Sequence, residues 1–169
     1  MHRAPDNFDI DRTPNSPPAG TVVAMWRLAE PGDDDSLVEM CLRLYDEDPG
    51  ILPIHPENMR ATLRALRREP SRGRAVVLEV ENQLSGYALL IAFWSNELGG
   101  NICEVDELFV VPQRRNLGHG KSLFEAISSA LSRSDPVAVI RSDPCLERNL
   151  KADLDPGPSS TPRRRCRFW

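Results

Sequence analysis

The segment RRNLGHGKS carries two glycines, basic side chains and a hydroxyl at a point where an apolar run gives way to a helical pattern. Gly118 and Gly120 let the backbone approach a ligand closely, and the first N–H groups of a helix have no partner inside that helix. Such a helix start binds anions, phosphate above all. Arg115, Lys121 and Ser122 can add charge and hydrogen bonds there. The segment therefore indicates an anion site, although glycine pairs also occur in plain turns.

Two nucleotide-binding patterns are incomplete in this segment. Its last residues match the end of the loop G-x-x-x-x-G-K-[ST], but Arg115 stands where that loop has its first glycine. The pattern G-x-G-x-x-G is not completed either. A phosphate-binding domain for a nucleotide is therefore disfavoured.

Hydrophobic periodicity predicts the elements that position this segment. Strands are expected at residues 21–28, in a hairpin over 74–94 whose turn contains Gly86, at 101–111 and at 137–141. Two helices are expected between the first strand and the hairpin, and a third after the glycine segment. The order β-α-α-β-β-β-α-β predicts an α/β chain with a mixed sheet.

The first of these helices has a start signal in the sequence. Ser36 and Glu39 form an S-x-x-E pattern, which predicts a capping box, and the aspartates before them suit the positive end of a helix. The arginines of the second helix are expected to lie on solvated faces rather than to bind a partner.

Composition limits the classes of function. The chain has 169 residues and 40% hydrophobic content, enough for one domain with a single core. Its formal net charge of −4 creates no positive field toward nucleic acid or an anionic membrane. The longest apolar run, Tyr87–Trp94, is too short to span a bilayer, and the first ten residues contain no signal-peptide core. We expect a cytoplasmic protein with neither nucleic acid nor membrane as a partner.

The cysteines indicate neither a disulfide framework nor a metal site. Cys41, Cys103, Cys145 and Cys166 are widely spaced, with no C-x-x-C pair, and the histidines are scattered. Disulfides and structural zinc are disfavoured, and no metal is expected.

The two ends of the chain differ in composition from its middle. Residues 1–20 hold four prolines among polar residues and are expected to form a disordered leader. The folded domain is expected over residues 21–152. Residues 153–169 carry three prolines and an arginine cluster with little periodicity, so an irregular tail is expected there.

The segment DELFVVPQRRNLGHGKSLFEAI resembles the acetyl-coenzyme A signature of the GNAT superfamily of N-acetyltransferases, in which R-x-x-G-x-G and a helix follow an apolar strand. The stretch RNLGHG matches every fixed position of that signature. The element order from Thr21 to Arg141 also fits the family fold, a mixed, mostly antiparallel twisted sheet flanked by helices. The resemblance covers about 120 residues and implies an N-acetyltransferase domain.

The resemblance implies acetyl-CoA as co-substrate. Its pyrophosphate is expected on the amides of one loop, with help from the next lysine: Arg115, Asn116, Leu117, Gly118, His119, Gly120 and Lys121. Its pantetheine arm is expected to pair with main-chain groups of the central strand, at Leu108, Phe109 and Val110.

The resemblance also implies that an amine attacks the thioester directly, with a backbone N–H of the strand stabilising the developing oxyanion. The protonated amine needs a base. Asp106 and Glu107 resemble the acidic pair of spermidine/spermine and related diamine acetyltransferases, and strand alternation turns one of them toward the substrate. Glu104 is a weaker candidate. The alternative is that these carboxylates cap backbone groups or pair with arginines.

Two further groups of residues are candidates for the acceptor site. Asn96 and Glu97 lie in a loop that resembles the N-E-x-G-G sequence of one branch of the family. Tyr45, Asp46 and Glu47 form the second group, at the expected end of the first helix. Hydrogen bonding and packing are equally ordinary uses for these residues.

The C-terminal part departs from the family pattern. Asn149 and Ala152 keep two marks of N-x-x-A-x-x-L-Y, but Asp155 and Pro156 occupy the last two. The tyrosine that often protonates the leaving thiolate is therefore missing from its place. Without further strands, residues 137–141 would form an open sheet edge that can template a homodimer. The alternative to the enzyme is a catalytically weak acyl-CoA-binding or interaction protein with the same fold.

Overall fold

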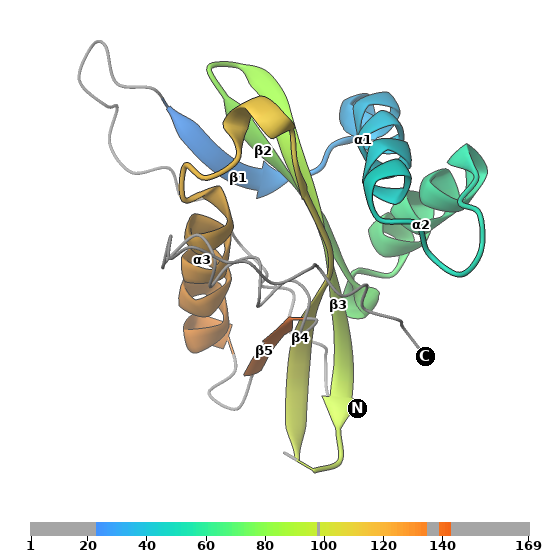
Figure 1. The fold of residues 1–169 in the computed structure, drawn as a ribbon. Helices are drawn as coiled ribbons and strands as arrows, with labels where there is room; N and C mark the ends of the chain where they lie inside the picture. Colours follow the sequence, from blue (N-terminus) through green and yellow to red (C-terminus); the bar gives the residue numbers. More distant parts are fainter. Residues whose placement is uncertain (1–22, 98, 135–138, 143–169) are drawn as a thin grey trace, which may run out of the picture.

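The computed structural model describes residues 23–97, 99–134 and 139–142 (Figure 1). The expected leader over residues 1–20 and the expected tail over 153–169 lie outside these residues, as do the family marks after the last strand.

The described elements follow the expected order. The strands are β1 (Ala24–Leu28), β2 (Gly73–Val80), β3 (Gln83–Ser95), β4 (Gly100–Val110) and β5 (Val139–Ser142). The helices are α1 (Asp34–Glu47), α2 (Pro56–Arg68) and α3 (His119–Ser134). Short 3-10 turns precede α1 (Pro31–Asp33), β2 (Pro70–Arg72) and α3 (Pro112–Arg114). The sequence therefore predicts both the type and the order of these elements correctly.

The strands form one mixed sheet in the order β1-β2-β3-β4-β5. Neighbouring strands are antiparallel, except that β5 runs parallel to β4. Helices α1 and α2 cover one face and α3 lies against the other (Figure 1). This arrangement confirms the expected mixed, mostly antiparallel sheet flanked by helices.

The central strands are buried on both faces. In β2, Val77 packs in the core under α1 and α2, whereas Val76 and Leu78 pack in the core under α3. All three side chains are fully buried. Continuous apolar runs, rather than strict alternation, are what such a strand requires.

The turn of the first hairpin differs from the sequence expectation. Glu81 and Asn82 form it, both with left-handed backbone (φ 52° and 63°), whereas Gly86 lies inside β3. A Cβ atom at Gly86 would lie 2.6 Å from the carbonyl oxygen of Phe109. This glycine therefore allows β3 and β4 to approach each other and does not make the turn.

The start of α1 is also earlier than the S-x-x-E pattern indicates. The helix begins at Asp34, so Ser36 lies within it and cannot cap its end. The backbone N–H of Glu30 instead donates to Asp33 Oδ2 at 2.8 Å, in the 3-10 turn that leads into the helix. The expected capping box at Ser36 and Glu39 is therefore wrong.

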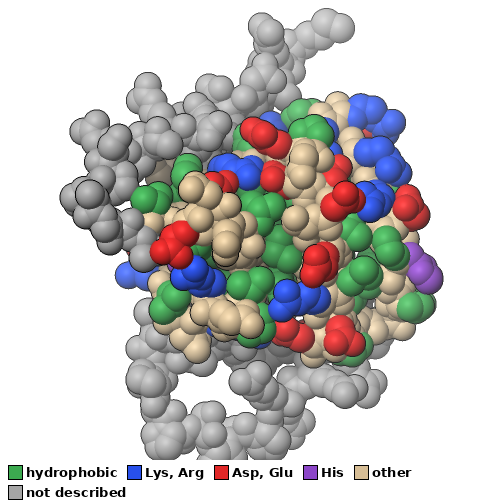
Figure 2. Space-filling view, turned by 90° about the horizontal axis from the view of Figure 1, so that it is seen from above, with side chains coloured by type: hydrophobic (Ala, Val, Ile, Leu, Met, Phe, Trp, Pro, Cys, Tyr) green, Lys and Arg blue, Asp and Glu red, His purple; other side chains and the backbone are tan. Residues whose placement is uncertain are grey.

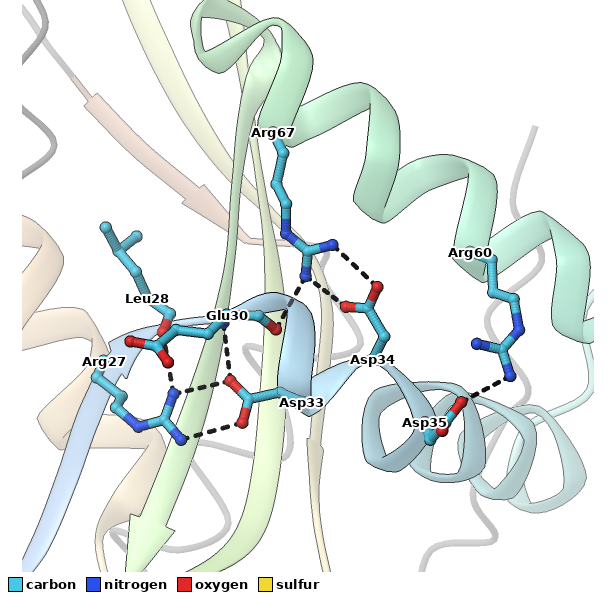
Figure 3. A network of polar contacts seen from close by, with 8 residues as sticks. All are labelled: Arg27, Leu28, Glu30, Asp33, Asp34, Asp35, Arg60 and Arg67. Atoms are coloured by element: carbon cyan, nitrogen blue, oxygen red, sulfur yellow. Dashed lines mark hydrogen bonds and ion pairs between the residues drawn. The ribbon is translucent and has the colours of Figure 1, made fainter.

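A network of ion pairs fixes α1 against β1 and α2 (Figure 3). Arg27 of β1 binds Asp33 through two bonds of 2.8 and 3.1 Å. Arg67 of α2 pairs with Asp34, at 2.9 Å for one of its two bonds. Two arginines of α2, Arg60 and Arg67, thus bind acidic side chains at the start of α1, where a solvated face was expected.

Candidate active site

A β-bulge interrupts the pairing of β3 with β4 at the acidic pair. Leu89 faces Glu107 and Leu90 faces Val105, so Asp106 is the extra residue of β4. On the other side of β4, β5 pairs only with residues 102–105. Among the described strands, the edge of β4 beyond the bulge has no partner. Bulges of this kind are frequent next to active sites, where they turn a side chain or end a pairing.

The main chain presents alternate residues to this open edge. The N–H of Val111 donates to Ser85 O at 2.9 Å, and antiparallel pairing then directs Phe109 and Glu107 toward β3. Leu108 and Val110 therefore direct their main-chain groups to the open edge. At this edge the carbonyl of Val110 accepts a hydrogen bond from Arg115 Nε at 2.7 Å.

Glu107 lies between two tyrosine hydroxyls. Tyr45 of α1 donates to its Oε1 at 2.9 Å, and Tyr87 of β3 donates to its Oε2 at 2.7 Å. Burial raises the pKa of Glu107; the two tyrosines lower it, and the nearby charge of Asp106 adds to the rise. Burial and the charge of Glu107 raise the pKa of both tyrosines, so both stay protonated as donors.

Beneath this carboxylate lies a thiol that remains protonated. Cys41 of α1 is buried and is not part of a disulfide. Burial, with a contribution from the charge of Glu107, raises its pKa to about 11. Because a thiolate is the reactive form, Cys41 is not suited to act as a nucleophile.

A cavity of about 430 Å³ adjoins the tyrosine on α1. The end of α1 and the loop that follows it line this cavity, through Leu42, Tyr45, Asp46, Pro49, Gly50, Leu52, Pro53 and Ile54. Its lining is largely apolar, with the carboxylate of Asp46 as its charged group. Tyr45 thus borders the cavity and also binds Glu107.

The glycine loop has the geometry of an anion site. Asn116 and Gly118 have left-handed backbone, with φ of 61° and 80°. A Cβ atom at Gly118 would meet no atom within 4 Å, so the space in front of this backbone is open. The first N–H groups of α3 follow directly, and backbone turns of this type form concave anion sites.

Comparison with known proteins agrees with this geometry. The sequence model of the acetyltransferase (GNAT) family matches residues 38–135. The chain belongs to the GNAT acetyltransferase family. This confirms the resemblance seen in the sequence, and the family generally uses acetyl-CoA for acetyl transfer. None of the curated protein sequences matches the chain.

Solved structures share the fold at low sequence identity. An integron cassette protein, HFX_CASS3, from the mobile metagenome of Cole Harbour Salt Marsh is 23% identical, with a TM-score of 0.62 and coverage of 82% of this chain and 89% of that one. A predicted acetyltransferase with acetyl-CoA from Clostridium acetobutylicum is 12% identical, with a TM-score of 0.61 and coverage of 82% and 92%. The ribosomal-protein-alanine N-acetyltransferase from Brucella melitensis biovar Abortus 2308 is 15% identical, with a TM-score of 0.59 and coverage of 86% and 100%.

In this GNAT protein, the arginine of the R-x-x-G-x-G motif binds α1. Arg115 pairs with Glu47 through one nitrogen, Nη2, which donates to both carboxylate oxygens at 3.0 and 2.7 Å. Its guanidinium also lies 5.3 Å from the centre of the Phe109 ring, whose side chain is buried in the core. Arg115 therefore joins the expected cofactor loop to the helix that carries Tyr45.

The other motif residues lie in different environments. Leu117 is exposed, and Lys121 lies on the exposed surface of α3, 3.8 Å from Glu125. His119 is anchored, because its carbonyl accepts a 3.0 Å bond from Trp26 Nε1. Its Nε2 is buried without a hydrogen-bond partner among the described residues, and burial lowers its pKa, with a contribution from Arg114.

The structure separates the predicted acceptor residues. Asn96 and Glu97 are exposed in the turn between β3 and β4, at the end of the hairpin that runs away from α1 (Figure 1). Ser95 is six residues along β3 from Leu89, the partner of Glu107, which corresponds to about 20 Å. Tyr45 lies at the carboxylate and Asn96 and Glu97 do not.

Sequence reasoning did not assign Tyr87 to the site. Tyr87 reaches Glu107 because β3 pairs with β4 beside the bulge, a contact that no local pattern encodes. Within the described residues, no group of three potential metal ligands lies together. No helix in the same part of the chain is both long and apolar enough to span a bilayer.

Proposed function

We propose that this protein is an N-acetyltransferase that transfers the acetyl group of acetyl-CoA to a primary amine of a small molecule or protein, by direct attack in a ternary complex. The observation that supports the proposal is the position of Glu107, which is partly buried, hydrogen-bonded by two tyrosines and joined through Tyr45 to an open cavity. Family membership and the N-acetyltransferase among the structural neighbours favour an amine acceptor.

The residues of this chain fit acetyl-CoA. Bound acetyl-CoA would supply the activated acetyl thioester. The left-handed backbone at Asn116 and Gly118 leaves room for a pyrophosphate in front of the α3 amides. The open edge of β4 at Leu108 and Val110 offers main-chain groups to the pantetheine arm.

Glu107 is the stronger candidate for the base. Its pKa is raised toward neutral pH, and a general base is most effective when its pKa lies near the working pH. Asp106 is exposed at the bulge. Asp46, in the cavity wall, would attract a cationic acceptor.

The test combines binding with turnover. Isothermal titration should show that the wild type binds acetyl-CoA, and a thiol-release assay over an amine panel should show acceptor-dependent release. Glu107→Gln should bind acetyl-CoA as before and lose about 10²-fold in kcat, the usual contribution of a general base. The neighbouring Asp106→Asn, the same chemical change at the bulge, should lose much less.

The outcomes also separate the alternative function. If the protein binds acetyl-CoA but releases no thiol with any amine, the alternative of a catalytically weak acyl-CoA-binding protein is favoured. A folded sample that does not bind acetyl-CoA would exclude both the N-acetyltransferase and the acyl-CoA-binding protein.

A further inference from the structure

Tyr45 is the residue that connects the cavity with the buried carboxylate. It is one of the residues that line the cavity, and its hydroxyl donates to Glu107 Oε1 at 2.9 Å. None of the other cavity-lining residues has a hydrogen bond to Glu107 among the described contacts. One residue of the cavity wall is therefore also hydrogen-bonded to the candidate base.

The second tyrosine has no such access. Tyr87 donates to the other oxygen of the carboxylate, but its residue is 0% exposed and its ring packs in the core under α1 and α2. On that side the Tyr87 hydroxyl adjoins the Cys41 thiol. Two tyrosine hydroxyls therefore bind one carboxylate, one from a residue that lines the cavity and one from a residue of the core.

Other titratable groups around the carboxylate do not offer a competing route. The Cys41 thiol stays protonated because its burial raises its pKa. Asp106 precedes Glu107 in the strand and contributes negative charge. Arg43 and Arg115 lie over the Phe109 ring, at 5.5 and 5.3 Å from its centre, so they bring positive charge to this side of β4.

We propose that Tyr45 is a catalytic residue that relays the acceptor's proton from the cavity to Glu107. The inference rests on the proposed function and assigns the proton path within it. One proton of the acceptor ammonium moves to the Tyr45 oxygen while the Tyr45 O–H proton moves to Glu107 Oε1. The tyrosine stays neutral, the carboxylate becomes a carboxylic acid, and the amine gains a free electron pair.

The rest of the reaction balances with the same groups. The nitrogen forms a bond to the acetyl carbon as the carbon–sulfur bond breaks, and the thiolate takes a remaining proton of the nitrogen. Neutral amide and thiol leave, and Glu107 returns its proton to solvent through Tyr45. Burial and the charge of Glu107 raise the pKa of Tyr45, so a phenolate is unfavourable there. The two proton transfers are therefore concerted.

The experiment compares Tyr45→Phe with Tyr87→Phe. Each variant removes one hydroxyl from the same carboxylate, so Tyr87→Phe measures the effect of losing one hydrogen bond on the core side. Both are assayed with the best acceptor of the amine panel and with analogues in which fluorine atoms beside the nitrogen make the ammonium more acidic. Thermal unfolding and acetyl-CoA titration verify that each variant folds and binds.

We expect Tyr45→Phe to lower kcat for the ordinary amine about 10²-fold. Its defect should shrink at least tenfold for an analogue that is already neutral at the assay pH, since the first proton transfer is then unnecessary. The Tyr87→Phe defect should not depend on the acidity of the acceptor. Tyr45→His, which restores a group that both donates and accepts, should recover part of the rate.

Three results decide the inference. A Tyr45→Phe defect that is the same for all acceptors would overturn the relay and leave the hydroxyl only a role in holding Glu107 by a hydrogen bond. Equal, acidity-dependent defects in both tyrosine variants would also overturn it. If the wild type itself releases no thiol with any amine, the proposed function fails, and the relay fails with it.

Discussion

At the scale of single residues, Glu107 makes the stability of the protein depend on pH. Burial raises its pKa above the ordinary value of 4.5, against the opposing bonds from Tyr87 and Tyr45. A carboxyl group with a higher pKa in the folded state stabilises the fold when protonated. That contribution is complete below the unfolded-state pKa and is lost as the pH rises through the folded-state pKa.

We therefore expect Glu107→Gln to gain stability relative to the wild type as the pH rises from about 5 to about 8. The measurement is the free energy of unfolding in urea, taken for both proteins across this range. Glu69→Gln is the control: the bond from Arg72 lowers the pKa of Glu69, so this group is charged in both the folded and unfolded states over this range and its stability difference should stay constant. A constant difference between Glu107→Gln and the wild type would contradict the raised pKa.

The sequence predicted this acidic pair but could not choose within it. Alternation along a strand turns successive side chains to opposite faces, so it indicates that one of Asp106 and Glu107 faces the substrate side. The choice depends on the bulge at Asp106, and a bulge arises from the pairing of β4 with β3. Tyr87 was beyond prediction for the same reason, since only the pairing brings it to Glu107.

At the scale of elements, the network at the start of α1 holds the helix that carries Tyr45 (Figure 3). Asp33 binds both terminal nitrogens of Arg27 and the N–H of Glu30, and its side chain is only 12% exposed. Its pKa is lowered chiefly by the bond from Arg27. Its contribution to stability is therefore present at neutral pH and is lost as the pH falls through that lowered pKa.

Asp33→Asn should destabilise the protein by about 1–3 kcal/mol at neutral pH, because it leaves partly buried donors without a charged acceptor. Asp35→Asn is the matched control. Asp35 is 89% exposed and pairs with Arg60, so its loss should cost less than about 1 kcal/mol. Urea unfolding of the two variants measures both effects. Equal costs would show that the Asp33 network does not hold α1.

Local patterns predicted the elements well and their junctions poorly. Periodicity located α1, α2 and α3 because one face of each helix packs in a core. The predictions of a helix cap at Ser36 and of a hairpin turn at Gly86 were wrong because each residue fits a local rule that tertiary contacts override. The chain enters α1 through a 3-10 turn whose Asp33 binds the N–H of Glu30 and also Arg27, and Gly86 is needed where β4 passes close to β3.

At the scale of the whole molecule, the described residues carry both signs of charge on the face that Figure 2 shows. Figure 2 shows acidic and basic side chains interspersed around apolar ones on the face seen from above. This agrees with the net charge of −4. We therefore expect recognition of an anionic cofactor to depend on local groups of the glycine loop, of which Arg115 is one.

The ion pair between Arg115 and Glu47 connects the two halves of the candidate site. Arg115 belongs to the loop expected to bind pyrophosphate, and Glu47 ends the helix that carries Tyr45 into the cavity wall. A guanidinium held by a carboxylate is less available to a phosphate, because both anions use the same planar donors. We therefore expect Glu47 to compete with the cofactor for Arg115.

We expect Glu47→Gln to bind acetyl-CoA about threefold to tenfold more tightly than the wild type, since the competing charge is gone. Glu81→Gln is the matched control, because it removes the same charge from an ion pair with the neighbouring Arg114, at 2.8 Å. Its effect should be smaller, as Arg114 is outside the R-x-x-G-x-G motif. Isothermal titration at one salt concentration measures all three affinities. If Glu47→Gln binds acetyl-CoA more weakly than the wild type, then Arg115 serves the cofactor by holding α1 in place and not by direct contact with pyrophosphate.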